Sequence, residues 1–567
     1  MQKTDITVRE LVDKVRRGEL TLPEMQRRYV WPATRVRDLL DSLYRGYPSG
    51  VILTWETDEN IETHEMAVRA TAAPTTTQKL LLLDGQQRIT SLSAILSGEK
   101  VHIRNKSKPI DILFNLDHPE GVLTEVIEVD ENDINHDIED EDEEAVERDI
   151  QEEFKKKTFV VTSRMLQNNP LWVPVSDIFV KTDRDILKPI GINSDDERWD
   201  KYSERLQKVR QIANYPYVMQ VLEKSMSYEE VTEIFVRVNS LGVKLRGSDL
   251  ALAQITSRWP GFMKLIEDFS DEFNDDAQYI IESNIPVRAL VVFATKQSKF
   301  KTVGKISLEE LKNNWDKAKE ALRFAINFLR SNAGIDNLEF LSSPFLLIPI
   351  AVYFNLKNGQ ISPSETNALL RWFYLAHMRG HYSMGSSESI LDADVSVMYR
   401  SSSLNELLAV LEQHVKRIVV SSDDLINRGI RSPFFSMLYF VLKQEGAKDW
   451  TTGLSLSDKH TGSAHSIQYH HIFPKSLLRD ANYDKKEINE MANMAFIGGK
   501  TNRYITNKQP IEYLEKEVLE KQGEDTLTSQ LIPLDKSLWE IDNYKDFLVW
   551  RREKIAESIN NFIGKLV

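Results

Sequence analysis

The chain of 567 residues contains no cysteine. This absence excludes disulfides, thiolate metal sites and cysteine nucleophiles, so any bound metal would be held by His, Asp, Glu, Asn or water. Long apolar runs are absent as well, because the most apolar window, residues 345–354, is too short for a membrane span and contains Pro349. The charged N-terminal segment has no apolar stretch typical of a signal peptide. We therefore expect a soluble, intracellular protein without a membrane partner.

An excess of positive charge is also missing, since 72 Lys and Arg face 86 Asp and Glu and the formal net charge is −14. This balance argues against a nucleic-acid partner until its distribution is considered. Residues 125–153 hold 16 acidic side chains and one Arg, and the rest of the chain carries 71 basic and 70 acidic side chains. We expect an acidic insertion near residues 118–160, and we favour a solvated loop over a DNA-mimicking flap that closes a basic groove.

The apolar pattern changes along the chain, whose length predicts two to four domains. Residues 51–55 (VILTW) and 79–84 (KLLLLD) predict buried strands. A predicted helix starts at Pro32 and places five apolar side chains on one face, namely Val36, Leu39, Leu40, Leu43 and Tyr44. Helical periodicity dominates residues 260–440, and mixed character returns after residue 440.

Histidine is scarce, with 11 in the chain, yet His460, His465, His470 and His471 fall within twelve residues. The last two belong to QYHHIFPKSLL, and we expect them on a strand. Adjacent side chains of a strand point to opposite faces, so one ring could bind a divalent metal while the other faces a scissile phosphate. MAFIGG predicts a second strand, and the segment that begins at Lys500 predicts a helix.

This order of strand, loop, strand and helix resembles the ββα-metal core of HNH endonucleases, with Asn493 placed 22 residues after His471 and Asn502 nine residues further. The resemblance implies that His471 is the general base that activates water. It implies that Asn493 accepts a hydrogen bond from the His471 ring and fixes its tautomer. His470 and Asn502 would be the metal ligands, with Asn507 in place of Asn502 if the register slips.

His470 occupies the position that many HNH relatives fill with Asp. We expect Mg²⁺ or Mn²⁺ as the cofactor. Ni²⁺ or Co²⁺ are alternatives, because imidazole suits Mn²⁺, Ni²⁺, Co²⁺ or Zn²⁺ better than a carboxylate does. Four nearby cations are expected to contact DNA phosphates: Lys475, Lys500, Arg503 and Lys508. The competing interpretation is a pair of structural histidines, and we assign His460 and His465 to loops.

A second motif, KLLLLDGQQRIT, predicts a strand, a GQQR turn and a helix from Ile89. Backbone N–H groups at such a helix start favour phosphate, and Arg88 would add a bidentate cation. Asp84 would hold a metal through water or orient Gln87. The motif is not a Walker A loop, and the alternative is a plain turn in which Arg88 pairs with a nearby carboxylate.

Two further blocks accompany this motif, and their polar and aromatic residues are Gln26, Arg27, Tyr29, Trp31, Arg237 and Asn239. In this order the three blocks resemble the N-terminal domain of GmrSD-type, modification-dependent restriction endonucleases, and residues 377–395 resemble the helical middle region of that family. The resemblance implies a ParB/sulfiredoxin-like α/β domain that binds and hydrolyses a nucleoside triphosphate, and GTP is the nucleotide that we expect. The implied nucleotide site comprises Asp84, Gly85, Gln86, Gln87, Arg88, Gln26, Arg27, Arg237 and Asn239.

Tyr29 and Trp31 are candidates for the wall of a modified-base pocket, although we favour core aromatics for both. The expected fold is a helix-rich, multidomain α+β protein. Its domains would be a nucleotide-binding α/β domain at residues 1–255, an all-helical linker at 256–435 and a ββα-metal HNH domain at 436–567.

The resemblance implies an NTP-regulated, metal-dependent endonuclease of the bacterial cytoplasm that restricts modified double-stranded phage DNA. A dimer or two sequential nicks would produce a double-strand cut. Two alternatives remain: a nucleotide-dependent DNA-binding switch with a degenerate HNH core, and an RNA-cleaving HNH nuclease.

Overall fold

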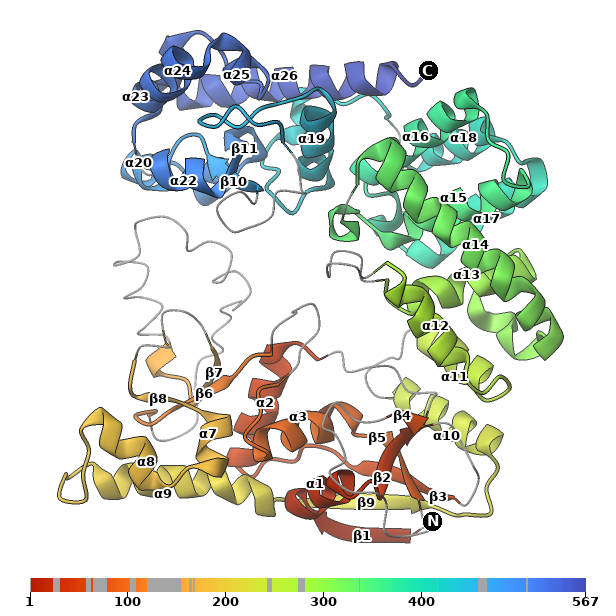
Figure 1. Cartoon of the computed structure of the whole chain (residues 1–567), viewed down its shortest axis with the longest axis vertical. Coiled ribbons are helices and arrows are strands. Elements are labelled where there is room, and N and C mark those ends of the chain that lie inside the picture. The colour runs from red at the N-terminus through yellow and green to blue at the C-terminus, as the bar shows by residue number, and fades with distance from the viewer. Residues whose placement is uncertain are drawn as a thin grey trace. The chain divides into compact units, whose positions relative to one another are not determined.

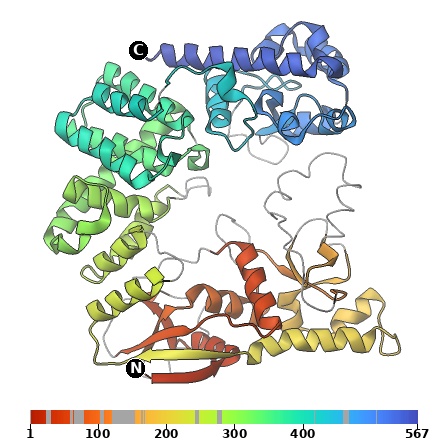
Figure 2. The same cartoon turned by 180° about the vertical axis from the view of Figure 1, so that it is seen from behind.

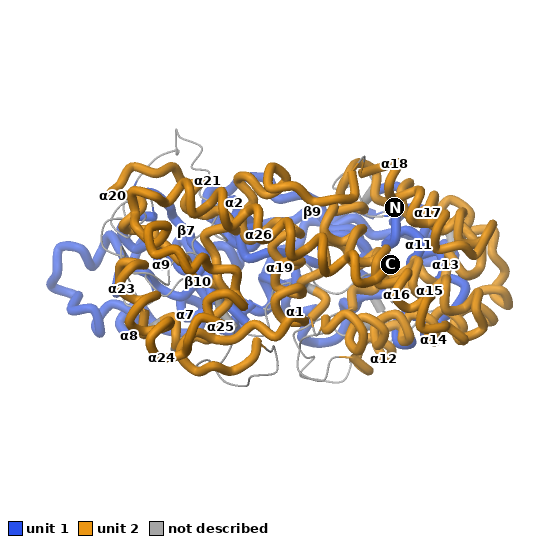
Figure 3. Tube along the Cα trace, turned by 90° about the horizontal axis from the view of Figure 1, so that it is seen from above, with its two compact units in different colours: residues 1–265 blue, residues 266–567 orange. Residues whose placement is uncertain are grey.

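The computed structural model describes residues 2–23, 31–57, 63–64, 79–101, 109–119, 154–162, 166, 169–241, 247–273, 281–335, 337–415, 417–456, 467–505 and 508–567. The chain forms two compact units, Met1–Leu265 and Ile266–Val567 (Figure 3). The fold is mixed α/β and rich in helix, which confirms the expected fold class. Within the described ranges, no helix is both long and apolar enough to cross a membrane. The predicted domain boundary near residue 435 stays a prediction.

A six-stranded mixed sheet organises the first unit (Figure 1). Its strand order is β1-β9-β3-β5-β2-β4. The strands are β1 (Gln2–Thr7), β2 (Leu20–Pro23), β3 (Ile52–Thr57), β4 (Thr63–His64), β5 (Lys79–Asp84) and β9 (Pro216–Leu222). β2 runs parallel to β5 and β3 runs parallel to β9, whereas the β1–β9, β3–β5 and β2–β4 pairs are antiparallel. The two strands expected from KLLLLD and VILTW are thus confirmed as β5 and β3.

Helices cover both faces of this sheet, since β5 is apolar on both sides. Leu82 lies in one core cluster with residues of α1, α2 and α3, whereas Leu81 and Leu83 lie in another with residues of α10 and α11. The first unit contains α1 (Val8–Arg16), α2 (Ala33–Tyr44), α3 (Gln86–Leu96), α7 (Val175–Val180), α8 (Asp183–Leu187), α9 (Trp199–Arg210), α10 (Tyr228–Leu241) and α11 (Gly247–Thr256). All five predicted apolar positions of α2 are buried.

A second, three-stranded sheet contains β7 (Phe159–Val161), β6 (Ile112–Asn115) and β8 (Trp172–Pro174), in that order. Figure 2 shows it from behind, beside α2 and α9. The acidic segment 125–153 falls between β6 and β7 in the chain and lies outside the described residues.

Helices make up the described part of residues 256–435, which contains no strand. They are α12 (Phe262–Asp271), α13 (Asn284–Thr295), α14 (Leu308–Ala333), α15 (Leu347–Leu356), α16 (Pro363–Met378), α17 (Ser387–Ser401), α18 (Leu404–Val415) and the start of α19 (Pro433–Gln444). Ser and Glu capping boxes start α14 and α16.

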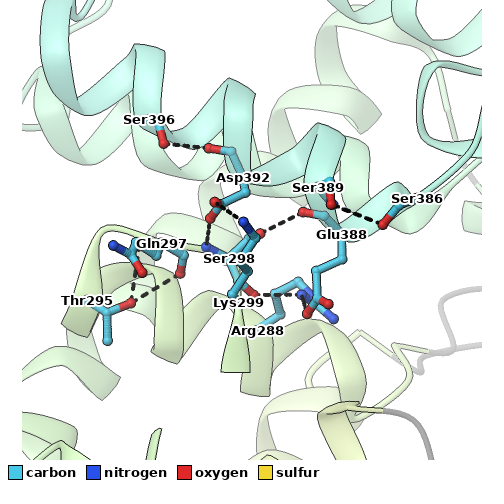
Figure 4. A network of polar contacts seen from close by, with 10 residues as sticks. All are labelled: Arg288, Thr295, Gln297, Ser298, Lys299, Ser386, Glu388, Ser389, Asp392 and Ser396. Carbon is cyan, nitrogen blue, oxygen red and sulfur yellow. Dashed lines mark hydrogen bonds and ion pairs between the residues drawn. The ribbon is translucent and has the colours of Figure 1, made fainter. Parts of the chain in front are cut away.

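A polar clamp joins α13 to α17 (Figure 4). The buried Arg288 guanidinium of α13 donates to the Ser298 carbonyl at 2.7 Å and pairs with Glu388 of α17 at 3.0 Å. The Ser298 N–H donates to the Asp392 carboxylate at 2.7 Å, and Lys299 pairs with the same carboxylate at 3.3 Å. The acidic residues Glu388 and Asp392 therefore hold these helices together.

The C-terminal part contains a hairpin of β10 (Ile467–His471) and β11 (Met494–Gly498) beside a long helix. The helices are α20 (Lys475–Asp480), α21 (Lys485–Ile488), α22 (Gly499–Ile505), α23 (Pro510–Tyr513), α24 (Glu520–Gln522), α25 (Glu524–Thr528) and α26 (Tyr544–Gly564). The Gln530 side chain accepts from the Phe496 N–H at 3.0 Å and so pairs with the edge of β11. Arg551 of α26 is buried and donates to the carbonyls of Ala492 and Met494. Burial lowers the pKa of Arg551 to about 9, so it keeps its charge at neutral pH.

The turn between α2 and β3 is locked by one arginine of the neighbouring strand-to-helix junction. Arg88 donates to the Ser49 carbonyl at 2.5 Å and the Val51 carbonyl at 2.9 Å, and it pairs with Asp84 at 3.0 Å. Gly50, with a φ of +97°, leaves space for this guanidinium, because a Cβ there would collide with Nη1 of Arg88. The guanidinium cannot move aside without losing these contacts.

We predict that Gly50→Ala destabilises the protein more than Gly46→Ala does. Gly46 has a φ of +74°, and no atom lies within 4 Å of the place that an added methyl group would take. Its substitution should therefore cost only the strain of positive φ, about 1 kcal/mol. The Gly50 substitution should cost about 1–3 kcal/mol more, since it displaces Arg88. Urea titration followed by tryptophan fluorescence measures both.

A double-mutant cycle isolates the cause. The extra cost of Gly50→Ala should disappear in an Arg88→Ala background. Equal costs at the two glycines, or an extra cost that survives without Arg88, would contradict the assignment.

Candidate functional site

The β10–β11 hairpin holds both histidines of the HHIFP motif. His470 lies opposite Ala495 and His471 lies opposite Met494 in the antiparallel register. Because the two residues are adjacent on a strand, their rings point to opposite faces. His470 Nδ1 lies 2.7 Å from Asn502 Oδ1 of α22. His471 Nε2 lies 3.1 Å from Oδ1 of Asn489, the residue that follows α21.

His470 is buried beside two aromatic rings. The residue is 3% exposed, and the rings of Trp450 and Tyr513 meet it edge-on with centroids 6.1 Å away. Its Nε2 has no hydrogen-bond partner within the described part of the chain. Burial lowers the pKa of His470 to about 4, against the opposing effect of Asn502. The ring is therefore neutral at neutral pH, the form that binds metals.

His471 is 5% exposed and lies near cations. Burial lowers its pKa well below the usual value, and the charges of Lys475 and then Arg479 add to this effect. A neutral imidazole can accept a proton, so the environment keeps His471 in the form that a general base requires. Arg479, one helical turn after Lys475 on α20, was not expected from the motif.

Asn493 does not contact the His471 ring, which corrects the expected hydrogen bond. Its Oδ1 accepts from the Phe473 N–H at 2.8 Å, and its Nδ2 donates to the carbonyls of Phe473 and Ile488, each at 3.1 Å. The side chain is fully buried. Both ends of the amide thus hold the backbone that follows β10, and Asn489 is the residue that contacts His471.

A buried carboxylate positions the helix that carries Asn502. Asp449 accepts from the Gly498 N–H at 2.7 Å and from the Thr501 hydroxyl at 2.7 Å, next to the first turn of α22. It also accepts from the Thr452 N–H at 2.8 Å and the Thr452 hydroxyl at 2.7 Å. Burial raises the pKa of Asp449, but these hydrogen bonds outweigh it and lower the pKa. Asp449 was not expected from the sequence, although the segment DWTTG that it begins contains turn residues.

His470 has one ring nitrogen left for a divalent cation. Asn502 Oδ1 only accepts, so Nδ1 of His470 carries the proton and donates to it at 2.7 Å. The lone pair is then on Nε2, which is buried and lacks a partner within the described residues. The described residues contain no cluster of three or more His, Asp or Glu side chains that could bind a metal. A cation here would complete its shell with water and phosphate oxygens.

The expected DNA-contacting cations are only partly described. Lys475 is half-buried beside His471, and Lys508 lies 4.5 Å from the ring centroid of the exposed Tyr504. The side chains of Lys500 and Arg503 lie outside the described residues, as do Asn507, His460 and His465.

The DGQQR motif joins β5 to α3 at Gly85, whose φ of +100° is left-handed. The helix begins at Gln86, so Gln86, Gln87 and Arg88 form its first turn instead of the expected turn before a helix at Ile89. Arg88 pairs with Asp84 and donates to the carbonyls of Ser49 and Val51. This pairing agrees with the alternative interpretation, in which the motif is a plain turn and Arg88 pairs with a nearby carboxylate. The Asp84 side chain is 38% exposed and remains accessible to a ligand.

The aromatic block preceding α2 meets the same motif. Gln87 Oε1 accepts from the Trp31 N–H at 3.1 Å. The Trp31 ring packs against the main core cluster, which favours the core interpretation of this aromatic. Arg237 of α10 is exposed and pairs with Glu233 at 2.5 Å. Gln26, Arg27 and Tyr29 lie outside the described residues, as does the side chain of Asn239.

Two comparisons with known proteins find similarity, one over the N-terminal part and one over nearly the whole chain. Residues 8–256 match the family of the GmrSD restriction endonuclease, N-terminal domain. The chain is also similar to Uncharacterized protein MJ0686 of Methanocaldococcus jannaschii, with 23% identity over 98% of this chain and 95% of that protein. Residues 8–256 are thus identified as a domain of the kind found at the N-terminus of the GmrSD restriction endonuclease family.

Proposed function

We propose that the chain is a metal-dependent DNA endonuclease of the HNH type, whose N-terminal domain binds a nucleoside triphosphate and regulates cleavage. One observation carries the proposal: two adjacent, buried and neutral histidines each contact an asparagine amide on a different side of β10. In this proposal, one ring binds a cation and the other accepts a proton.

The reaction assigns a role to each side chain. His471 takes a proton from water, and the resulting hydroxide attacks the phosphorus while the 3′ oxygen leaves. His470 would hold the divalent cation through Nε2, and Asn502 would fix the orientation of its ring. When bound, the cation supplies charge stabilisation at the scissile phosphate. Lys475 stands near His471 and would attract the phosphate backbone. Asn493 shapes the turn through which β10 leaves the site.

Membership of a restriction endonuclease family supports DNA as the substrate. Modified phage DNA is the proposed target, and a dimer or two successive nicks would complete a double-strand cut. Asp84 and the first turn of α3 are proposed to bind the triphosphate through backbone N–H groups and a metal-bound water. Because Arg88 already holds the Ser49–Val51 carbonyls, we assign it to shaping this site.

His471→Ala should abolish cleavage, with a loss of about 10²–10⁴-fold, because no other group would deprotonate the water. The assay compares phage DNAs with and without cytosine modification, in Mg²⁺ or Mn²⁺, with and without GTP. His414→Ala is the control, since His414 is an exposed residue of α18. Cleavage by His471→Ala at the wild-type rate would contradict the proposal.

The same assay tests the two alternatives. DNA binding that depends on nucleotide, without cleavage by the wild type under any metal, would favour a switch with a degenerate HNH core. Cleavage of RNA in preference to DNA would favour an RNA-directed nuclease.

Asp84→Asn should weaken binding of a fluorescent GTP analogue by about tenfold or more, because the site loses its anionic oxygen. Asp41→Asn is a matched control. Asp41 also pairs with an arginine four residues later, Arg45, at 2.8 Å and is 33% exposed, so its substitution should change affinity less than about twofold. Fluorescence titration measures both, and equal losses would contradict a nucleotide site at Asp84.

A further inference from the structure

The amide of Asn489 has its orientation fixed by its two contacts. Its Nδ2 donates to the Lys485 carbonyl at 3.0 Å, and its Oδ1 lies 3.1 Å from Nε2 of His471. A carbonyl only accepts, so the donor end of the amide must face Lys485. The acceptor end then faces His471, and a hydrogen bond forms only when Nε2 of the ring carries the proton.

The backbone around Asn489 is clamped to the loop before α19. The Glu490 carboxylate accepts from the Asn427 N–H at 3.0 Å and pairs with Arg552 at 3.2 Å. The Met491 N–H donates to the Arg428 carbonyl at 2.5 Å. Glu490 is 1% exposed, so its two contacts are shielded from water. Asn489 therefore cannot follow His471 if the ring turns.

We propose that Asn489 is a positioning residue that holds His471 with its proton on Nε2 and leaves the Nδ1 lone pair as the base atom. This inference rests on the proposed nuclease function for its chemical meaning. During attack, the water proton moves to Nδ1 and the ring becomes a cation. The Nε2–H then donates to Asn489 from a charged ring, and such a hydrogen bond is stronger than the neutral one. The leaving 3′ oxygen takes a proton from solvent, and His471 then releases its own proton to solvent.

The contact with the His471 ring distinguishes Asn489 from Asn493, which lies four residues later and binds only backbone groups. The amide oxygen of Asn493 accepts from the Phe473 N–H, and its Nδ2 donates to the carbonyls of Phe473 and Ile488. All of these contacts are to backbone groups, and none is to the His471 ring. Burial of the His471 ring excludes most water as a substitute partner, which makes the single amide oxygen decisive for the tautomer.

The test uses the full-length protein with Asn489→Leu and Asn489→Asp. Leu removes the acceptor at similar size, whereas Asp keeps an oxygen at the same place. Asn489→Leu should lower kcat for DNA cleavage by about 10–100-fold with little change in KM. Asn489→Asp should restore kcat to within a few-fold of wild type. Equal losses in both variants, or a loss confined to KM, would overturn the inference.

Asn314→Leu is the matched control. Asn314 on α14 also donates its Nδ2 to the carbonyl four residues earlier, Glu310, at 2.8 Å. That contact is exposed, and its loss should leave kcat unchanged. A fall in kcat equal to that of Asn489→Leu would attribute the effect to lost helix stability and overturn the inference.

A second readout does not depend on cleavage. In protein labelled with ¹⁵N in the histidine rings, the His471 signals are identified by their absence in His471→Gln. We expect an unprotonated Nδ1 and a protonated Nε2 in the wild type, and a mixture of tautomers in Asn489→Leu. A protonated Nδ1 in the wild type would overturn the inference. Failure of the wild type to cleave any nucleic acid would instead refute the proposed function, while the spectrum would still decide the tautomer.

Discussion

The alternation of side chains along β10 is the constraint on which the candidate nuclease centre depends. His470 and His471 are neighbours, so a strand directs their rings to opposite sides and each ring meets a different environment. One side offers Asn502 and the rings of Trp450 and Tyr513. The other offers Asn489 and the cations of α20. A helix would have separated the two rings by only part of a turn, and this division of cation binding from proton transfer would be lost.

Buried polar side chains bind backbone groups of the β10–β11 hairpin that further strands would bind in a larger sheet. An isolated hairpin is marginal in water because its edges and faces are unprotected. Gln530 pairs with the outer edge of β11, and Arg551 binds the carbonyls at its start. Asp449 holds the first turn of α22 through Gly498 and Thr501. Each of these groups has several partners, so its burial cost is offset by hydrogen bonds.

Local pattern was enough to predict much of this arrangement. The apolar runs placed β3, β5 and the buried face of α2, and the order of strand, strand and helix around HHIFP placed β10, β11 and α22. These features depend on periodicity within a few residues, which sequence carries directly. The helical character of residues 256–435 followed from the same signal.

Contacts between residues that are distant in the chain could not be predicted from local sequence patterns. Asn489 and Asn493 are both asparagines of one short segment, and only the 3₁₀ turn Met491–Asn493 decides which amide faces His471 and which faces the backbone. Asp449 lies 49 residues before Gly498, and Arg551 meets Met494 from a helix 57 residues later. For Arg88 the pattern left two interpretations open, and the side chain pairs with Asp84 and the carbonyls of Ser49 and Val51.

The most direct test of the central claim is cleavage of DNA in ¹⁸O-labelled water, followed by mass spectrometry of the product ends. Attack by a water activated at His471 predicts 5′-phosphate ends that carry one ¹⁸O atom, together with 3′-hydroxyl ends. Products with 3′-phosphates, or 5′-phosphates without the label, would contradict the account.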